Sequence, residues 1–520
     1  MRICIVAEGC YPYVVGGVSS WIHSLIAQFP QHEFIILAIV ADRSYRGNFV
    51  YDLAGNVAEV YEMYLQDMDW SERESKGASH VKLKKKEINA LRSLLLNNEV
   101  DWNTMFEMME NPSLSVNDLL MGVDFLEAVK DCYRTKYRDA VFSDFLWTMR
   151  SIYLPMFLVM KFNVPKADLY HCVATGYAGL LGTMAKKKHG SHFLISEHGI
   201  YTREREEELV KAKWVQGIYK SIWIDQFRKM SYVAYQRCDL VTSLYEHARE
   251  LQIDLGCPPE KTMVTPNGIN TERFQNLRVK LPEDEGYINI GAVLRVTPIK
   301  DVKTMIRAFY YAKSQEKSLK LWIMGPWDED QEYANECFEL VESMKIEDVV
   351  FTGRINVTEY LGRMDCTILT SISEGQPLTI LEGYAAKKPV IATDVGNCYG
   401  LIYGEDDDFG PAGILTHIMN VEEIASAMVR MARNETERLQ MGEAGYKRLM
   451  RKYKVEDMRD TYRSIYDGFE HVSKTSAISA EELEKRRMEE EEPWESVDKV
   501  DEEDEPWASV DVSGMDDPWK

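Results

Sequence analysis

The stretch INIGAVLRVTPIKDVKTMIRAFYYA at residues 288–312, followed by LKLWIM at 319–324, decides the fold class. Residues 288–294 and 319–324 are short runs of β-branched and other apolar residues, and the segment between these runs is longer and amphipathic. That pattern predicts a buried strand, a crossover helix and a second, parallel strand. Because the alternation recurs along most of the chain, we expect an α/β fold of doubly wound parallel sheets.

The candidate strands fall into two series, which predict two Rossmann-like domains. At roughly 150 residues per domain, 520 residues leave room for additional segments. We place the domains at residues 1–280 and 285–452. The first series is Arg2–Ala7, Phe34–Val40, Leu169–Val173, His192–Ser196, Leu240–Leu244 and Thr262–Thr265; the second is Ile288–Leu294, Leu319–Met324, Val349–Thr352, Thr367–Thr370 and Val390–Thr393.

Two regions break the alternation. More than a hundred residues separate Val40 from Leu169, and apolar residues recur there at helical spacing, so we expect a helical insertion at about residues 60–160. Residues 476–520 are acidic and repeat the words EPWESVD (492–498) and EPWASVD (505–511). A segment so poor in aliphatic residues predicts a disordered acidic tail, which either solvates the protein or docks partners through its tryptophans.

Composition excludes several classes of protein. Hydrophobic residues make up 45% of the chain, enough for a sizeable core, and the formal charge of −23 argues against nucleic acid as the main partner. The nine cysteines are dispersed without a metal-binding spacing, which suggests a reducing compartment. No signal peptide and no transmembrane segment is recognisable, so we expect a cytoplasmic protein.

Charged residues and glycines follow the predicted strands, where parallel sheets bind ligands. If the two sheet edges face each other, these residues line a cleft between the domains. Fixed cations, a glycine turn and a helix start near Thr379 suit phosphate oxygens, so a metal-free anion site is preferred to the acidic triplets at 67–69, 328–330 and 406–408. The candidate residues are Gly17, His198, Arg295, Lys300, Gly353, Arg354, Glu374, Leu378 and Thr379.

Glu374 and Glu382 are eight residues apart, and Pro377 between them suits the first turn of a helix. Retaining hydrolases need their two carboxyl groups about 5 Å apart, whereas eight helical residues rise about 12 Å. The pair therefore either grips different parts of one extended ligand or consists of ordinary carboxylates at a helix start. In the first interpretation Glu382 accepts hydrogen bonds from a ribose diol, and Glu374 lies nearer the reacting end.

Several motifs resemble retaining glycosyltransferase family 4, in the order typical of that family, over residues 1–470. EGQPLTILE at 374–382 looks like its E-x7-E motif, and GAVLR at 291–295 with Lys300 is similar to its phosphate-clamp segment. TPNGIN at 265–270 resembles its inter-domain motif, with Asn270 where Asp is usual. The resemblance implies a GT-B fold with two Rossmann-like domains, and a helix at 453–475 that crosses back onto the first.

A narrower resemblance covers the opening AEGCYPY at 7–13, the turn GGVSSW at 16–21 and the segment EHGIYTRER at 197–205. These are similar to the cytosolic glycosyltransferases of the Pel exopolysaccharide system, which also carry a helical insertion in the first domain.

By family resemblance Arg295, Lys300 and the Gly17 amide would hold a diphosphate. Glu382 would bind the ribose, and Glu374 and His198 the donor sugar. The backbone of Gly353–Ile355 would face the base.

The resemblance implies an enzyme that transfers a sugar from a UDP-sugar, either UDP-N-acetylhexosamine or UDP-glucose, with retention and without a metal or other cofactor. The acceptor would be a growing exopolysaccharide of the Pel type. An inner-membrane complex would be the partner, at the inner face of the membrane. Alternatives are a starch- or sucrose-synthase-like enzyme, a lipid-linked-sugar transferase, or a non-catalytic assembly scaffold of the same fold.

Overall fold

The computed structural model describes residues 1–66 and 82–490, with side chains as far as residue 472. By its internal contacts the chain divides after Tyr466, and the first unit, Met1–Tyr466, holds both predicted sheets. The repeated tryptophan words at 492–511 lie outside the described residues.

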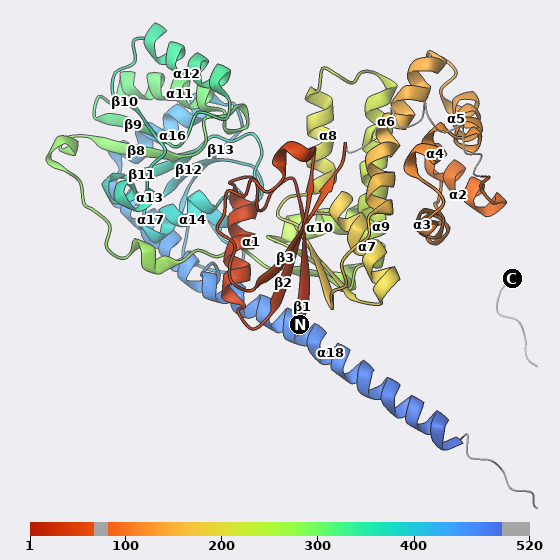
Figure 1. The fold of residues 1–520 in the computed structure, drawn as a ribbon. Coiled ribbons are helices and arrows are strands. Elements are labelled where there is room, and N and C mark those ends of the chain that lie inside the picture. The colour runs from red at the N-terminus through yellow and green to blue at the C-terminus, as the bar shows by residue number, and fades with distance from the viewer. Residues whose placement is uncertain (67–81, 491–520) are drawn as a thin grey trace, which may run out of the picture. The chain divides into compact units, whose positions relative to one another are not determined.

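The first sheet has, among the described residues, seven parallel strands in the order β3-β2-β1-β4-β5-β6-β7. Its strands β1, β2 and β3 are labelled in Figure 1. Its two longest pairings join β1 to β2 and β2 to β3. The central strands are apolar on both faces, as expected for a parallel sheet covered by helices. The bounds are β1 (Arg2–Glu8), β2 (Glu33–Val40), β3 (Val57–Tyr64), β4 (Leu169–Cys172), β5 (His192–Ser196), β6 (Leu240–Ser243) and β7 (Thr262–Val264).

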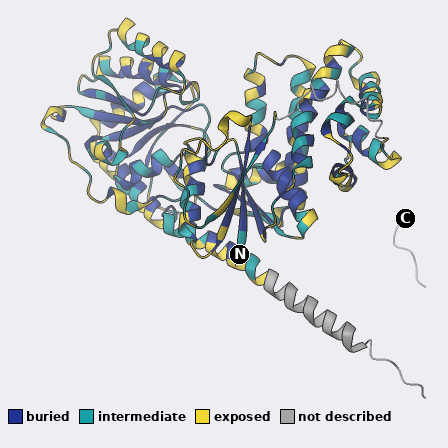
Figure 2. Cartoon of the chain, viewed as in Figure 1, coloured by how far each residue is buried: buried dark blue, intermediate teal, exposed yellow. Residues whose placement is uncertain are grey.

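The second sheet has six parallel strands, in the order β10-β9-β8-β11-β12-β13 over the described chain. Both sheets run 3-2-1-4-5-6 from one edge, the classical doubly wound order, so the prediction of two Rossmann-like domains is confirmed. Figure 2 shows buried residues concentrated in the strands and in the helix faces that cover them. The bounds are β8 (Ile288–Val293), β9 (Leu319–Met324), β10 (Val349–Gly353), β11 (Cys366–Leu369), β12 (Val390–Thr393) and β13 (Gly413–Thr416).

Helices cover both sheets. Those of the first domain are α1 (Gly17–Gln28), α7 (Tyr177–His189), α8 (Tyr201–Lys211), α9 (Ile218–Arg237) and α10 (Glu246–Asp254). Those of the second are α11 (Val302–Gln315), α12 (Gln331–Ser343), α13 (Val357–Tyr360), α14 (Leu378–Ala385), α15 (Cys398–Tyr403), α16 (Val421–Arg433) and α17 (Glu435–Lys452). Within the described chain, no helix combines the length and the apolar character needed to span a bilayer.

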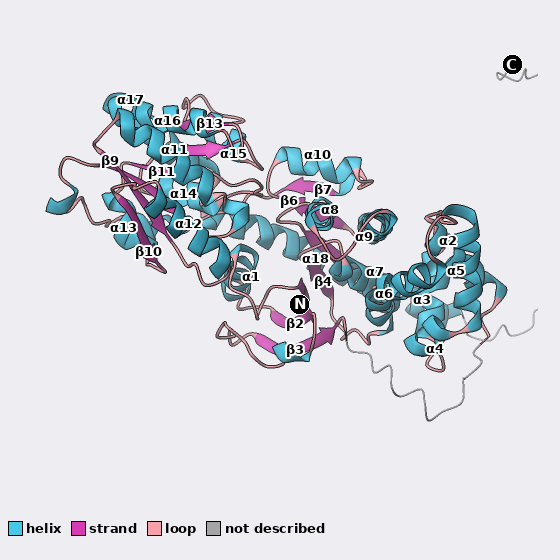
Figure 3. Ribbon diagram, turned by 90° about the horizontal axis from the view of Figure 1, so that it is seen from above, coloured by secondary structure: helices cyan, strands magenta, loops and turns pink. Residues whose placement is uncertain are grey.

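The expected insertion contains the helices α2 (Lys85–Leu96), α3 (Trp102–Glu110), α4 (Val116–Met121), α5 (Val123–Lys136) and α6 (Phe142–Lys161). Helices α3, α4 and α5 contact α6, and α6 in turn contacts α7 of the Rossmann-like domain (Figure 3). The apolar side chains of the insertion form one continuous cluster with those of the first sheet. The insertion is therefore part of the core of that domain.

Two strands and part of a helix differ from the prediction. Strand β3 occupies the start of the region assigned to the helical insertion, and its glutamates at 59 and 62 interrupt the apolar run that marks a buried strand. Strand β13 is four residues long and begins with glycine. The last helix, α18 (Val455–Glu490), continues through residues 476–490, which the sequence analysis had assigned to the disordered tail.

The first turns of α18 contact the first sheet through a buried polar network. The Tyr466 hydroxyl lies 2.9 Å from His171 Nδ1, and the Tyr462 hydroxyl lies 2.9 Å from Ser196 Oγ and 3.1 Å from Thr242 Oγ1. Ser196 in turn lies 2.8 Å from His171 Nε2. Burial lowers the pKa of His171 to about 3, so its ring stays neutral and joins the network as one donor and one acceptor.

The two segments that connect the domains, at Ile269 and at Tyr453–Val455, run side by side. Ile269 N–H donates to the Tyr453 carbonyl and Val455 N–H to the Ile269 carbonyl, both at 3.0 Å. A Cβ at Gly268 would lie 2.2 Å from the Lys454 carbonyl oxygen, so only glycine allows this approach. The entry to the second domain and the return from it are thus joined at one place.

We expect Tyr462→Phe to lower the free energy of unfolding by about 1–3 kcal/mol, because Ser196 and Thr242 lose a buried hydrogen-bonding partner. Chemical denaturation would measure the change. Tyr310→Phe is the matched control, since Tyr310 is 40% exposed on α11. Equal stability of the two variants would show that the network does not hold α18.

Candidate active site

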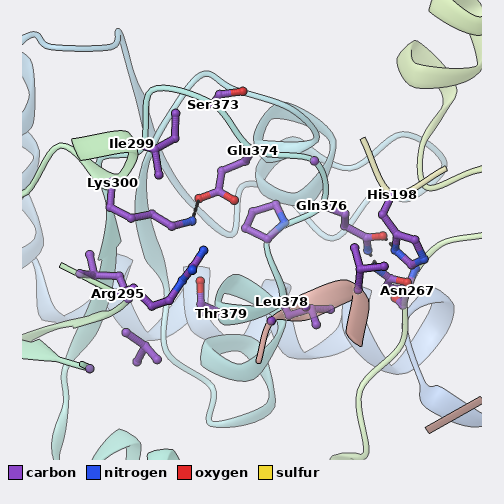
Figure 4. Close-up of a pocket in the computed structure, with 18 of the residues that line it drawn as sticks. His198, Asn267, Arg295, Ile299, Lys300, Ser373, Glu374, Gln376, Leu378 and Thr379 are labelled. Carbon is purple, nitrogen blue, oxygen red and sulfur yellow. Dashed lines mark hydrogen bonds and ion pairs between the residues drawn. The ribbon is translucent and has the colours of Figure 1, made fainter. Parts of the chain in front are cut away.

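A cavity of about 820 Å³ lies where the carboxyl edges of the two sheets face each other. The second sheet contributes residues that follow β8, β9 and β11, and the first contributes residues that follow β1, β5 and β7. Figure 4 shows residues of both domains around it, with Lys300 and Glu374 on one side and His198 and Asn267 on the other. The predicted cleft between the domains is therefore present.

Most predicted site residues line this cavity. Gly353 and Glu382 do not: Gly353 ends β10 with a positive φ of 69°, and a Cβ there would lie 3.2 Å from the indole of Trp327. The predicted residues that do line it are Gly17, His198, Arg295, Lys300, Arg354, Ile355, Glu374, Leu378 and Thr379.

Lys300 and Glu374 form an ion pair inside the cavity, with side chains only 18% and 12% exposed. The Ser371 hydroxyl donates to the same carboxylate oxygen at 2.6 Å. The backbone at Lys300 is also held in place, because the Thr370 hydroxyl donates to the Lys300 carbonyl at 3.0 Å. Because the pair is largely removed from water and braced by hydrogen bonds, both charges keep defined positions.

Arg295 also lines the cavity, and its ion pair is more exposed to solvent. It follows β8, its guanidinium pairs with Glu329, and their side chains are 45% and 51% exposed. Exposed pairs of this kind contribute little to stability, so Arg295 is available to another anion at small cost. Glu329 belongs to the acidic triplet at 328–330, whose side chains were the weaker candidates for an ion site.

The loop after β11 contacts the first domain through its backbone. A Cβ at Gly375 would lie 2.4 Å from the His198 carbonyl oxygen, so glycine is required for this approach. Next to it, Asn267 N–H donates to Gln376 Oε1 at 2.8 Å, across the two domains. Asn267 and Gln376 belong to the motifs TPNGIN and EGQPLTILE, but neither was predicted as a site residue.

His198 lies in this contact region with its ring against Trp21, at 4.4 Å between centroids and nearly edge-on. Burial lowers the pKa of His198 to about 4, so the imidazole is neutral near pH 7. Its Nε2 is buried without a hydrogen-bonding partner among the described residues. A neutral ring of this kind can exchange one hydrogen bond with a ligand in the cavity.

Glu197 fixes the turn that carries His198. Its buried carboxylate accepts hydrogen bonds from Tyr235 at 2.6 Å, Gln252 at 3.0 Å and Thr175 at 3.0 Å. Burial still raises the pKa of Glu197 above its usual value, despite these donors. The full set of partners indicates a structural role for Glu197, because few of its acceptor sites are left for a ligand.

Helix α8 forms a wall of the cavity that the sequence analysis missed. Glu204, Glu207, Glu208 and Lys211 all line it. A Cβ at Gly199 would collide with the Glu204 carboxylate, at 1.9 Å from Oε1. The signal was present in the spacing, since residues three and four apart share one face of a helix.

The two acidic triplets that the structure describes, at 328–330 and 406–408, do not gather into metal sites. Asp407 forms an ion pair with the buried Arg448, which fixes the loop at 406–408 for structural reasons. The triplet at 67–69 lies outside the described residues. Among the residues that are described, no three His, Cys, Asp or Glu side chains are grouped as metal ligands would be.

Comparison with protein families identifies both halves of the chain. Residues 1–260, half of its length, match the model of the domain of unknown function DUF3492, and residues 273–448 match that of the glycosyl transferases group 1. The chain belongs to the DUF3492 family and carries a group 1 glycosyltransferase domain. The cavity lies between these two matched regions, which contribute residues from either side.

Characterised relatives are similar over part of their length. The alpha-monoglucosyldiacylglycerol synthase of Streptococcus pneumoniae is 30% identical over 215 residues, which cover 36% of this chain and 47% of that protein. The MMP alpha-(1->4)-mannosyltransferase of Mycolicibacterium hassiacum is 22% identical over 58% of this chain and 70% of its own. The chain thus spans about half of the first relative, and both relatives are named as enzymes of sugar transfer.

Solved structures share the fold. HepE of Anabaena, crystallised with UDP and glucose, has a TM-score of 0.55 at 13% identity and covers 90% of this chain and 99% of its own. Sucrose-phosphate synthase of Thermosynechococcus elongatus has a TM-score of 0.57 at 14% identity, over 91% and 99% of the two chains. At such identities the likeness concerns the fold alone, which is the predicted GT-B arrangement.

We expect Glu382→Gln to change how stability depends on pH. Burial raises the pKa of Glu382 to about 7, so between pH 4.5 and 7 the folded protein keeps a proton that the unfolded chain releases. Stability due to this group therefore falls as pH rises through that window. Glutamine avoids the loss, so the variant should gain roughly 1–3 kcal/mol over the native protein between pH 5 and pH 8.

Denaturant unfolding at the two pH values measures this difference. Glu285→Gln, at an exposed glutamate, is the control and should show no such gain. A constant gap between Glu382→Gln and the native protein at both pH values would contradict the raised pKa.

Proposed function

We propose that this protein transfers a sugar from a UDP-sugar, UDP-N-acetylhexosamine or UDP-glucose, onto a growing polysaccharide with retention of the anomeric configuration. One observation carries the proposal: a largely buried cation, Lys300, and a more exposed one, Arg295, face the same cavity as the start of α14. Helix starts present unpaired N–H groups to anions, so cations and amides together suit a diphosphate.

In the proposed complex the diphosphate lies between Lys300, Arg295 and the first-turn amides of α14, with the Gly17 amide opposite. Glu374, released from part of its contact with Lys300, accepts hydrogen bonds from the donor sugar. His198 Nε2, which is buried and unpartnered within the described chain, exchanges a hydrogen bond with the same sugar. Arg354 and the backbone near Ile355 lie toward the uracil, and Glu382 requires a small movement of α14 to reach the ribose.

The reaction breaks the bond between the anomeric carbon and the phosphate oxygen. Negative charge develops on the departing UDP, and preorganised cations and amides stabilise it without a divalent ion. The acceptor hydroxyl attacks from the face that UDP leaves, and its proton passes to the departing phosphate oxygen. Glu374 is paired with Lys300, which favours this front-face displacement over a covalent enzyme intermediate.

We further propose that the product is an exopolysaccharide of the Pel type, made in the cytoplasm beside an inner-membrane complex. The segments AEGCYPY, GGVSSW and EHGIYTRER support this narrower assignment. Gly17 and His198, which two of these segments contribute, line the cavity. Other family 4 activities and a non-catalytic scaffold are the alternatives, and the measurements below distinguish them.

We expect Lys300→Ala to lower turnover by a factor on the order of 10²–10³, because one stabilising contact to the leaving diphosphate is lost. UDP release from a panel of UDP-sugars measures it. Lys303→Ala is the matched control: Lys303 is three residues away but pairs with Glu336 outside the cavity.

Glu374→Ala should also lose turnover, and a chelator should leave the native activity unchanged. Near-normal release by Lys300→Ala would refute the assigned site. Release that depends on a divalent ion would refute the metal-free mechanism. Silence of the native protein with every donor would favour the scaffold.

A further inference from the structure

A second cavity, of about 460 Å³, lies on the first domain where α6 meets the segment between α8 and α9. Three indoles line it: Trp147 from α6, Trp214 from the connecting segment and Trp223 from α9. Trp147 is 55% exposed and Trp214 is 72% exposed. Side chains of this size are seldom left in water together, so the group indicates a binding surface.

The indoles offer flat apolar faces in more than one orientation. Trp214 and Trp223 meet edge to face, at 83° and 6.1 Å between centroids. Trp223 is in turn stacked on Phe227 at 5.7 Å, so its ring is braced from the core. The Trp223 ring is thus fixed by packing, whereas the Trp214 ring is open to solvent, as expected of a preformed binding surface.

Polar groups lie around these rings. Thr148, Gln216 and Tyr219 also line the cavity, and the structure gives their side chains no hydrogen-bonding partner within the described residues. A pyranose ring has a face of C–H groups and an edge of hydroxyls. Aromatic faces bordered by unused hydroxyl and amide groups match both parts of that chemistry, whereas a purely apolar ligand would leave the polar groups unsatisfied.

Helix α8 connects this pocket to the catalytic cavity. Glu204, Glu207 and Lys211 line the catalytic cavity along α8, and Trp214 follows Lys211 by three residues. The 11 residues of α8 span about 16 Å, the length of a few linked sugars. The carboxylates on this helix can accept hydrogen bonds from sugar hydroxyls.

We propose that the aromatic pocket binds the growing polysaccharide, a chain of hexoses or N-acetylhexosamines, a few units behind the acceptor end in the catalytic cavity. This inference rests on the proposed function, because it assigns the pocket to the acceptor of that reaction. Binding at a distance keeps the polymer attached between transfers through a high local concentration of its end. The pocket thereby favours long acceptors over short ones.

Titration calorimetry of the full-length protein with chitohexaose and with maltohexaose tests the proposal. The native protein should bind at least one of them, and Trp214→Ala should weaken that binding roughly tenfold, the loss expected for one aromatic contact. Trp214→Phe keeps a ring and should retain most of the affinity. Tyr311→Ala removes an aromatic that is 54% exposed on α11, far from the pocket in sequence and outside its lining, and should bind as the native protein does.

Titration with UDP separates this proposal from the proposed function. All four proteins should bind UDP equally, because Trp214 and Tyr311 do not line the catalytic cavity. If the native protein does not bind UDP, the result counts against the proposed function alone. Failure of the native protein to bind either hexasaccharide, or equal binding by Trp214→Ala, would overturn the pocket assignment. So would binding to phosphatidylglycerol vesicles that requires Trp214 while neither sugar binds.

Discussion

The two sides of the interdomain cavity meet at the loop after β11, where one backbone contact leaves no room for a side chain. Gly375 approaches the carbonyl of His198 so closely that a Cβ would lie 2.4 Å from its oxygen, and the neighbouring Gln376 receives a hydrogen bond from Asn267. These contacts set the distance between the ion pair of the second domain and the histidine of the first. The geometry of every ligand contact across the cleft depends on them.

The two ion pairs in the cleft differ in their exposure to solvent. Lys300 is largely buried and balanced by Glu374, whereas Arg295 is half exposed and paired with a carboxylate that solvent also reaches. A buried cation without a partner would be costly, so Glu374 stabilises Lys300 when the cavity holds no anion. In the proposed complex, the same carboxylate becomes a hydrogen-bond acceptor once the diphosphate pairs with the lysine. In the proposed reaction, donor binding thus exchanges one ion pair for another.

The sequence was sufficient for the architecture because long apolar strands and strand-end motifs carry strong local signals. It failed where tertiary context decides. Strand β3 lies at a sheet edge and carries glutamates at 59 and 62, so it lacks the continuous apolar run of central parallel strands. The acidic face of α8 was overlooked because a charged helix ordinarily faces solvent, and only the opposing domain makes this one part of a cavity. Gly353 and Glu382 do not line the cavity in this structure, and their predicted contacts with a nucleotide stay predictions.

The pairing of the two segments that connect the domains has a mechanical consequence. Ile269 on the outward passage and Tyr453–Val455 on the return are hydrogen-bonded to each other in both directions. Because the two connecting segments are joined at one place, the domains can rotate relative to each other about a single hinge. A rotation of this kind would widen the cleft for the proposed substrates while the crossing segments barely move.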